Sequence, residues 1–154
     1  MTTSKTEATS LVRQVSIDAP AATVFKYLTD PSLMTKWMGQ KVIFEPFEGG
    51  EYRVEISDTI VAGGKVVEVE QDRRVVYTFG WEGDENPVTV GSSRVEITLE
   101  EKDGSTLVVL SHTEIAGAVA EHGGGWEHYL ARLSIAATGG DPGPDPMAQK
   151  TADD

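Results

Sequence analysis

The chain has 154 residues, the length of one compact domain. Its 25 acidic and 13 basic side chains give a formal net charge of -12, which disfavours nucleic acid and anionic membrane surfaces as partners. There is no cysteine, which excludes disulfides, thiol nucleophiles and cysteine-bound metals.

The two ends differ in composition from the rest. Residues 1–9 are small and polar, and residues 139–154 are rich in Gly, Pro and Asp. Neither end can bury much apolar area, so we expect two disordered tails around a folded domain at 10–138. The N-terminus lacks the apolar core of a signal peptide, and no apolar run approaches the about 20 residues of a membrane helix. We therefore expect a cytoplasmic protein with no membrane partner.

The first part of the domain predicts a strand and two short helices. Residues 10–17 alternate apolar and polar side chains, as a half-buried strand does. In the next segment Asp18 can cap a helix and Pro20 suits a first helical turn. The pattern breaks and restarts after Pro31, which indicates a second short helix.

From residue 41 onward the period changes from 3.6 to 2, which indicates consecutive strands. Gly49 and Gly50 form a hairpin turn between the first two of them. Gly63 and Gly64 interrupt a longer strand, where we expect a bulge or a sharp bend. The expected strands are 41–47, 50–56, 59–70, 73–81, 92–101 and 106–115.

The last expected element is a long amphipathic helix from Trp126 onward. It follows Gly123, Gly124 and Gly125, each of which costs a helix about 1 kcal/mol relative to alanine. Strands joined by short turns pair as antiparallel neighbours, and one long helix can cover the apolar face of a curved sheet. The predicted fold class is α+β, with two short helices after the first strand.

Five segments together resemble one superfamily over about residues 11–137. They are VSIDAPAATVFKYLTDPSLMTKWMG, FEGGEYRVEI, GGKVVEVEQDRRVVYTFGW, SRVEITLEEKDGSTLVVLSHTEI and HGGGWEHYLARL. The chain resembles the START/Bet v 1-like (SRPBCC) superfamily, and most of all its branch of heat-shock-protein-90 ATPase activator homologues. The resemblance implies a helix-grip fold with an internal cavity between the long helix and the concave sheet. Members of the superfamily include binders, cyclases and co-chaperone domains, so the resemblance does not imply one function.

Aromatic side chains are spread along elements that should face one interior. They suit a flat or ring-containing ligand, and three tyrosines among them could each offer it a hydroxyl. The alternative is that these side chains simply fill the core. The residues that we expect to line a ligand site are Trp37, Tyr52, Tyr77, Phe79, Trp81, Val95, Ile97, His112, Trp126, Tyr129 and Leu133.

His112 is the one weak candidate for catalysis. It shares a strand face with Val108 and Leu110, so it should point inward. There it could bind a ligand oxygen, act as a general base, or be a core histidine with satisfied hydrogen bonds. A metal site made of His112, His122 and His128 has no supporting spacing. We therefore expect no metal and no cofactor.

Three functions follow from these observations. The first is binding of a small apolar or aromatic molecule in the internal cavity. The second is an enzyme, a cyclase or hydrolase, that uses the same cavity, and the third is a co-chaperone-like domain that binds a protein partner. The residues favour a binder over an enzyme. The segment Gly123–Gly125 is either a hinge that admits a ligand or a place where the backbone passes close to a strand.

Overall fold

The computed structural model describes residues 10–83, 89–114, 119–143 and 145, and for 119–124 it describes the backbone alone. The expected N-terminal tail, residues 1–9, lies outside the described residues. The elements are β1 (Ser10–Ile17), α1 (Ala21–Thr29), α2 (Pro31–Met34), β2 (Lys41–Phe44), β3 (Glu51–Glu55), β4 (Val61–Glu70), β5 (Arg74–Trp81), β6 (Ser93–Lys102), β7 (Ser105–Thr113) and α3 (Val119–Ala137).

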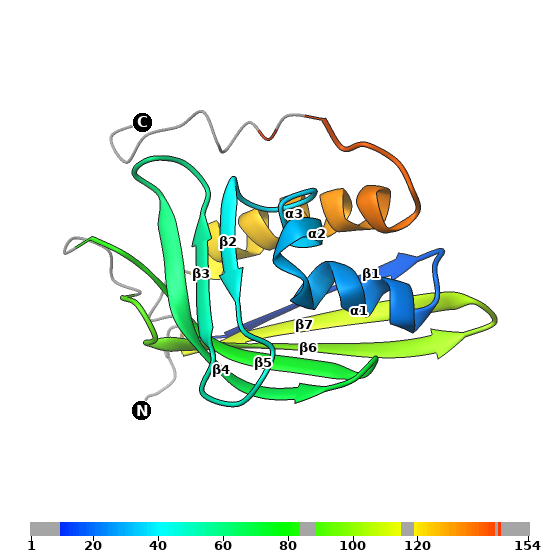
Figure 1. The fold of residues 1–154 in the computed structure, drawn as a ribbon, viewed down its shortest axis with the longest axis horizontal. Coiled ribbons are helices and arrows are strands. Elements are labelled where there is room, and N and C mark those ends of the chain that lie inside the picture. Colours follow the sequence, from blue (N-terminus) through cyan, green and yellow to red (C-terminus); the bar gives the residue numbers. More distant parts are fainter. Residues whose placement is uncertain (1–9, 84–88, 115–118, 144, 146–154) are drawn as a thin grey trace, which may run out of the picture.

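The strands form one seven-stranded sheet with the order β1-β7-β6-β5-β4-β3-β2, and neighbouring strands run antiparallel. The sheet curves around α3, and α1 and α2 lie on the same side of it as α3 (Figure 1). The prediction of an α+β helix-grip fold is confirmed.

A hydrophobic core lies between the sheet and the helices. On β6 and β7 the side chains alternate between buried and more exposed, so one face of each strand supplies the core. α3 packs along β1 and contributes Leu130, Leu133 and other buried side chains. Burial of each large apolar side chain stabilises the fold by roughly 1.5–3 kcal/mol.

The start of α1 differs from the expectation. Pro20 occupies the N-cap position, so Asp18 lies too far upstream to cap the helix. Asp18 instead accepts a hydrogen bond from the Ser105 hydroxyl at 3.1 Å. The backbone N–H of Ala21 donates to Glu101 Oε1 at 2.8 Å, so a side chain from β6 satisfies the helix start. The predicted Asp18 cap is wrong.

The bulge in β4 lies beyond the glycine pair. The register with β5 shifts between Val66 and Glu68, not at Gly63 and Gly64. Gly64 has another purpose, because a Cβ there would lie 2.0 Å from the carbonyl oxygen of Thr78. Glycine is therefore needed for close approach of the two strands.

α3 begins earlier than expected. Its backbone is helical from Val119, so the segment Gly123–Gly125 lies inside the helix. A Cβ at Gly125 would meet nothing within 4 Å. Close approach to a strand therefore does not explain Gly125, and the hinge remains a prediction.

After α3 the chain turns back along the outer side of the helix (orange-red in Figure 1). Gly139 adopts a φ of 91°, and the N–H of Gly140 donates to the carbonyl oxygen of Ile135 at 2.8 Å, which closes the helix end. The segment 139–143 and residue 145 belong to the stretch in which we expected a tail. The domain boundary at 138 stays a prediction.

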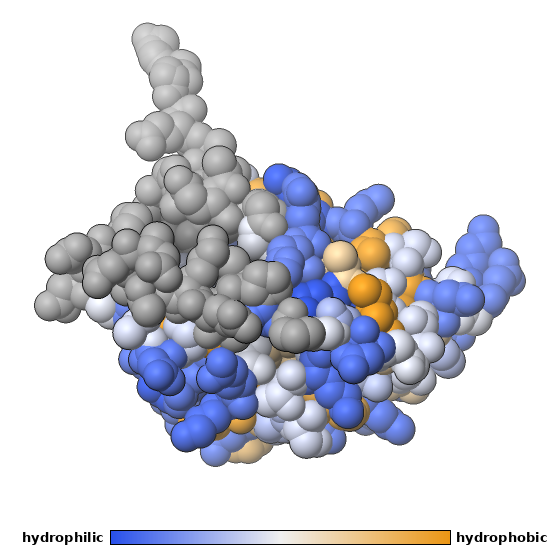
Figure 2. All heavy atoms as spheres, turned by 90° about the horizontal axis from the view of Figure 1, so that it is seen from above, coloured by the Kyte–Doolittle hydropathy of each residue, from blue (hydrophilic) through white to orange (hydrophobic). Residues whose placement is uncertain are grey.

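Hydrophilic side chains cover most of the coloured surface seen in Figure 2, with small hydrophobic areas between them. The large apolar side chains that are exposed among the described residues are Val12, Ile43, Phe47, Val90 and Ile135. In the same part of the chain, no helix has the length and apolar character needed to cross a bilayer.

Candidate functional site

The sequence-predicted ligand residues come together in the interior. All of them except the half-buried Trp81 are buried. They come from the segment after α2, from β3, β5, β6 and β7, and from α3. The fold therefore brings the predicted set into one buried cluster between the sheet and α3.

Aromatic rings form a continuous row through this interior. Tyr52 and Tyr77 stack with ring centroids 4.1 Å apart, and Phe44 meets both rings edge-on, at 6.2 and 6.3 Å. Phe79 extends the row toward α3, where its centroid lies 5.8 Å from that of Trp126. The Phe44 contacts are edge-to-face and the Tyr52–Tyr77 contact is stacked, as aromatic rings prefer, whereas the rings of Phe79 and Trp126 are tilted by 51°.

His112 lies at the end of this row with no exposed surface. The indole N–H of Trp126 donates to His112 Nδ1 at 2.9 Å, and His112 Nε2 lies 2.8 Å from Ser93 Oγ. Ser93 Oγ in turn donates to the carbonyl oxygen of Phe79 at 2.6 Å. The four groups form a chain that joins α3, β7, β6 and β5.

The direction of this chain determines the tautomer of His112. An indole nitrogen can only donate, so Nδ1 must accept. Ser93 uses its proton on Phe79, so His112 Nε2 carries the hydrogen and donates to Ser93. His112 is therefore neutral with both ring nitrogens bonded, which is the core histidine with satisfied hydrogen bonds rather than an available general base.

The hydroxyl of Tyr52 is buried and has no hydrogen-bond partner among the described residues. Burial raises the pKa of Tyr52 well above its ordinary value, and the neighbouring Tyr77 raises it further. The two hydroxyls nevertheless do not meet hydrogen-bond geometry. Burial likewise raises the pKa of Tyr77. A buried hydroxyl without a hydrogen bond lowers the stability of a protein by about 1–3 kcal/mol. A polar partner for the Tyr52 hydroxyl would therefore be stabilising.

Tyr129 and His128 on α3 share a carboxylate. The Tyr129 hydroxyl donates to Asp145 Oδ2 at 2.7 Å, and His128 Nε2 lies 2.9 Å from Asp145 Oδ1. Burial, followed by the hydrogen bond to Asp145, raises the pKa of Tyr129. Nothing in the Gly- and Pro-rich composition around Asp145 signals this contact.

Arg132 ties the end of the chain to the rest of the domain. Its Nε donates to the carbonyl oxygen of Trp37 at 3.0 Å, and one terminal nitrogen donates to the carbonyl oxygen of Pro142 at 3.3 Å. The side chain is buried. A single guanidinium therefore joins α3 to the segment after α2 and to the segment after α3.

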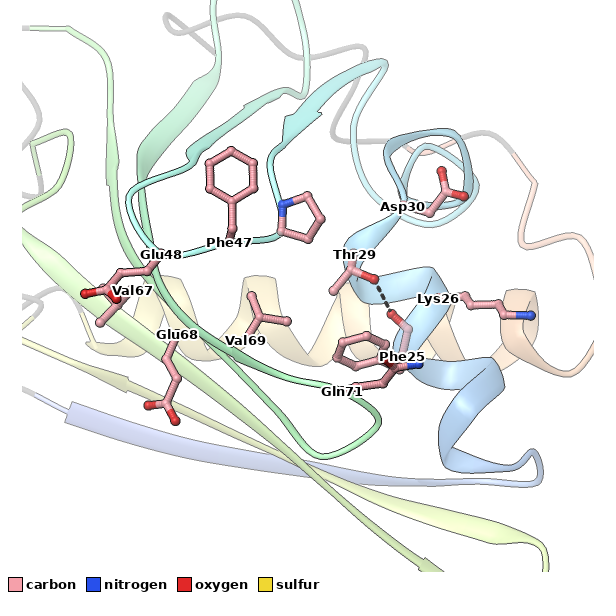
Figure 3. A pocket seen from close by; sticks show the side chains of 11 residues that line it. Phe25, Lys26, Thr29, Asp30, Phe47, Glu48, Val67, Glu68, Val69 and Gln71 are labelled. Carbon is pink, nitrogen blue, oxygen red and sulfur yellow. Dashed lines mark hydrogen bonds between the residues drawn. The ribbon is translucent and has the colours of Figure 1, made fainter.

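A groove of about 770 Å³ opens between α1, the loop from β2 to β3, and the second half of β4 (Figure 3). The residues that line it are Phe25, Lys26, Thr29, Asp30, Pro46, Phe47, Glu48, Val67, Glu68, Val69 and Gln71. None of them was among the predicted site residues, because three segments that are far apart in sequence build the groove.

The groove combines an apolar lining with a charged edge. Phe25 and Val69 are partly buried against the core, whereas Phe47 is 57% exposed. Asp30 accepts hydrogen bonds from the side chain and the backbone N–H of Ser32, and these lower its pKa. Its carboxylate therefore stays ionised at neutral pH. An aromatic residue, Phe47, beside Pro46 in the EPFEGG segment is a sequence feature that could have drawn attention to this groove.

No group of three or more His, Asp or Glu side chains is placed to hold a metal ion in the described part of the chain. We expected no metal site at His112, His122 and His128. The side chain of His122 falls outside the described residues, His128 bonds Asp145, and His112 is enclosed in the core.

A curved antiparallel sheet that grips a C-terminal helix over an aromatic interior defines a helix-grip protein of the SRPBCC superfamily. The family model described as "Activator of Hsp90 ATPase homolog 1-like protein" matches residues 18–137. The chain belongs to this family.

Solved structures share this fold. An AHSA1-like protein from Rhizobium etli is 42% identical, with a TM-score of 0.70, over 92% of this chain and 89% of that one. DynU16, from the dynemicin biosynthetic locus, has 24% identity and a TM-score of 0.74; the match covers 86% of this chain but only 48% of DynU16. The Aha1 dimer of Colwellia psychrerythraea has 17% identity and a TM-score of 0.72, over 85% and 97% of the two chains. No curated protein matches the sequence.

Proposed function

We propose that this protein binds a small apolar or aromatic molecule in the interior between the sheet and α3. The Tyr52 hydroxyl carries the proposal, because it is buried without a protein partner among the described residues. A ligand that offers one hydrogen-bonding group to Tyr52 and an apolar surface to the neighbouring rings would compensate the buried hydroxyl. The stacked ring of Tyr77 makes a flat ligand the best match.

The groove beside α1 supplies the opening in this proposal. Its volume of about 770 Å³ is within the size range of small-molecule sites. Phe44, whose ring contacts Tyr52 and Tyr77, stands two residues before Pro46 of the groove wall. A ligand that enters between Phe25 and the loop from β2 to β3 would therefore reach the tyrosine pair by displacing Phe44.

The test uses two probes that differ in one hydroxyl, 2-naphthol and naphthalene. Binding to the wild-type chain and to Tyr52→Phe is measured by titration calorimetry or fluorescence. We expect 2-naphthol to bind Tyr52→Phe about five- to tenfold more weakly, the size of one hydrogen bond, and naphthalene to bind both alike. Tyr27→Phe, at a half-buried position on α1, is the matched control and should change neither.

A second readout separates binding from folding. Because the Tyr52 hydroxyl has no described partner, its removal should leave the ligand-free protein as stable as before or more stable. Loss of stability in Tyr52→Phe would mean that the hydroxyl is already bonded within the protein. Failure of both probes to bind the wild-type chain would contradict the proposal.

The enzyme and interaction alternatives have less support. Both ring nitrogens of His112 are bonded within the core, so the weak catalytic candidate has no lone pair left for a substrate. A protein partner is suggested by the family's name rather than by a feature of the described surface. Both functions remain predictions.

A further inference from the structure

Two adjacent side chains of α3 hold one carboxylate. Tyr129 and His128 contact different oxygens of Asp145, at 2.7 and 2.9 Å. The Tyr129 hydroxyl donates to one oxygen, and His128 Nε2 can donate to the other. Hydrogen bonds to an ionised carboxylate are stronger than those between neutral groups.

This carboxylate is enclosed rather than solvated. The side chain of Asp145 is 9% exposed, although the residue stands in a segment rich in Gly and Pro. Tyr129 is buried, and His128 is one-third exposed. Helix α3 therefore presents a preformed receptor for a carboxylate, and in the ligand-free chain the protein's own Asp145 occupies it.

The receptor adjoins the interior in which we propose a ligand. Tyr129 and Tyr52 belong to the same buried cluster between the sheet and α3. The Tyr129 side chain lies in that cluster while its hydroxyl donates to Asp145. A molecule with a carboxylate at Tyr129 could extend its apolar part along the same side of the interior.

The segment that leads to Asp145 contacts α3 and its own turn. The carbonyl oxygen of Pro142 accepts from Arg132 at 3.3 Å, and Asp141 caps its own turn by accepting from the N–H of Gly143. Residues 141–143 lie outside regular secondary structure. Segments without regular secondary structure open locally at lower cost than the helices and strands of the core.

We propose that His128 and Tyr129 form a carboxylate-binding site, that Asp145 blocks it in the ligand-free chain, and that an apolar carboxylic acid binds by displacing Asp145. The contact is an autoinhibitory one, because a tethered carboxylate competes at a high effective concentration. This proposal rests on the proposed function in one respect, which is the location of the apolar part of the ligand in the interior. The carboxylate site itself depends on the two α3 side chains.

The test compares 2-naphthoate with 2-naphthol on the full chain and on Asp145→Asn. The variant keeps the shape of the side chain but removes its charge. We expect 2-naphthoate to bind Asp145→Asn about tenfold more tightly than wild type, and 2-naphthol to bind both equally. Asp141→Asn is the matched control, since Asp141 contacts only its own turn in the described structure, and it should leave both affinities unchanged.

The ring signals of His128 in NMR spectra measure occupancy of the carboxylate site directly. They do not depend on where the apolar part of the ligand lies. They should shift in Asp145→Asn and return toward their wild-type positions when 2-naphthoate is added. Tyr129→Phe in the Asp145→Asn background should abolish the gain in affinity.

Equal 2-naphthoate affinity in wild type and Asp145→Asn overturns the autoinhibitory contact. Tighter binding that persists without the Tyr129 hydroxyl overturns the assignment of the site. Binding of 2-naphthol with no binding of 2-naphthoate to Asp145→Asn overturns this inference and leaves the proposed function intact. Binding of 2-naphthoate to Asp145→Asn, with no binding of 2-naphthol or naphthalene to the wild-type chain, contradicts the proposed function and leaves this inference intact.

Discussion

The indole N–H of Trp126 donates a 2.9 Å hydrogen bond to His112 Nδ1 in the buried core. His112 Nε2 donates its N–H to Ser93 Oγ, and the Ser93 hydroxyl donates to the carbonyl oxygen of Phe79. Because Nδ1 must accept from the indole, all these groups are satisfied only while His112 is neutral. The bond fixes the middle of α3 to β7, directly after the three glycines.

Removing the Ser93 hydroxyl should break this chain at its centre. In Ser93→Ala, the Nε2 hydrogen of His112 loses its acceptor in a buried site, so we expect the free energy of unfolding to fall by about 1–3 kcal/mol. Urea denaturation measures the change. The matched control is Ser105→Ala, which removes an exposed hydrogen bond to Asp18 and should cost no more than about 0.5 kcal/mol. An equal loss of unfolding free energy in the two variants would contradict the hydrogen-bond chain through Ser93.

Replacement by alanine should have opposite effects on stability at Gly125 and at Gly64. A Cβ at Gly125 meets nothing within 4 Å, so Gly125→Ala should stabilise the protein by up to about 1 kcal/mol through helix propensity. A thermal unfolding midpoint that rises would support this result. A midpoint that falls would mean that Gly125 serves a contact rather than flexibility.

At Gly64, replacement by alanine should strongly destabilise the fold. The new Cβ would lie 2.0 Å from the carbonyl oxygen of Thr78 on β5, and backbone cannot yield there without loss of strand pairing. We expect Gly64→Ala to destabilise by several kcal/mol or to prevent folding, which circular dichroism of the purified protein would reveal. A stable, wild-type-like Gly64→Ala protein would refute the close approach of β4 and β5.

The buried tyrosines predict a loss of stability at alkaline pH. Burial raises the pKa of Tyr52, Tyr77 and Tyr129 in the folded state above the ordinary value near 10. The unfolded chain therefore releases these protons first, so stability is fully present below about pH 10 and falls as pH rises above it. Ultraviolet titration at the tyrosinate band should show these residues ionising only as the protein unfolds. Reversible ionisation of all tyrosines near pH 10 in the folded protein would contradict their burial.

Local patterns predicted the elements well because each pattern reflects burial on one side. The alternation in β6 and β7 identified their inward faces, and the same parity places Ser93 inside, although a serine at a strand start attracts no notice. The α1 cap failed because its acceptor, Glu101, lies 80 residues away in sequence. Contacts of this kind depend on tertiary structure, which short-range periodicity does not encode.

The candidate site likewise has a part that could be predicted from sequence and a part that could not. The aromatic interior could be predicted, since its residues stand at inward positions of separate strands. The groove and the Asp145 contact could not, because the first joins three distant segments and the second comes from a stretch whose composition favours disorder. The unpartnered state of the Tyr52 hydroxyl likewise depends on the orientation of its neighbours.

The most direct test of ligand binding in the interior is to locate a bound aromatic probe by NMR. Intermolecular NOEs between 2-naphthol and the folded chain should connect the probe to the ring protons of Tyr52 and Tyr77. NOEs that connect the probe only to exposed residues such as Phe47, with none to the buried tyrosine pair, would contradict binding in the interior.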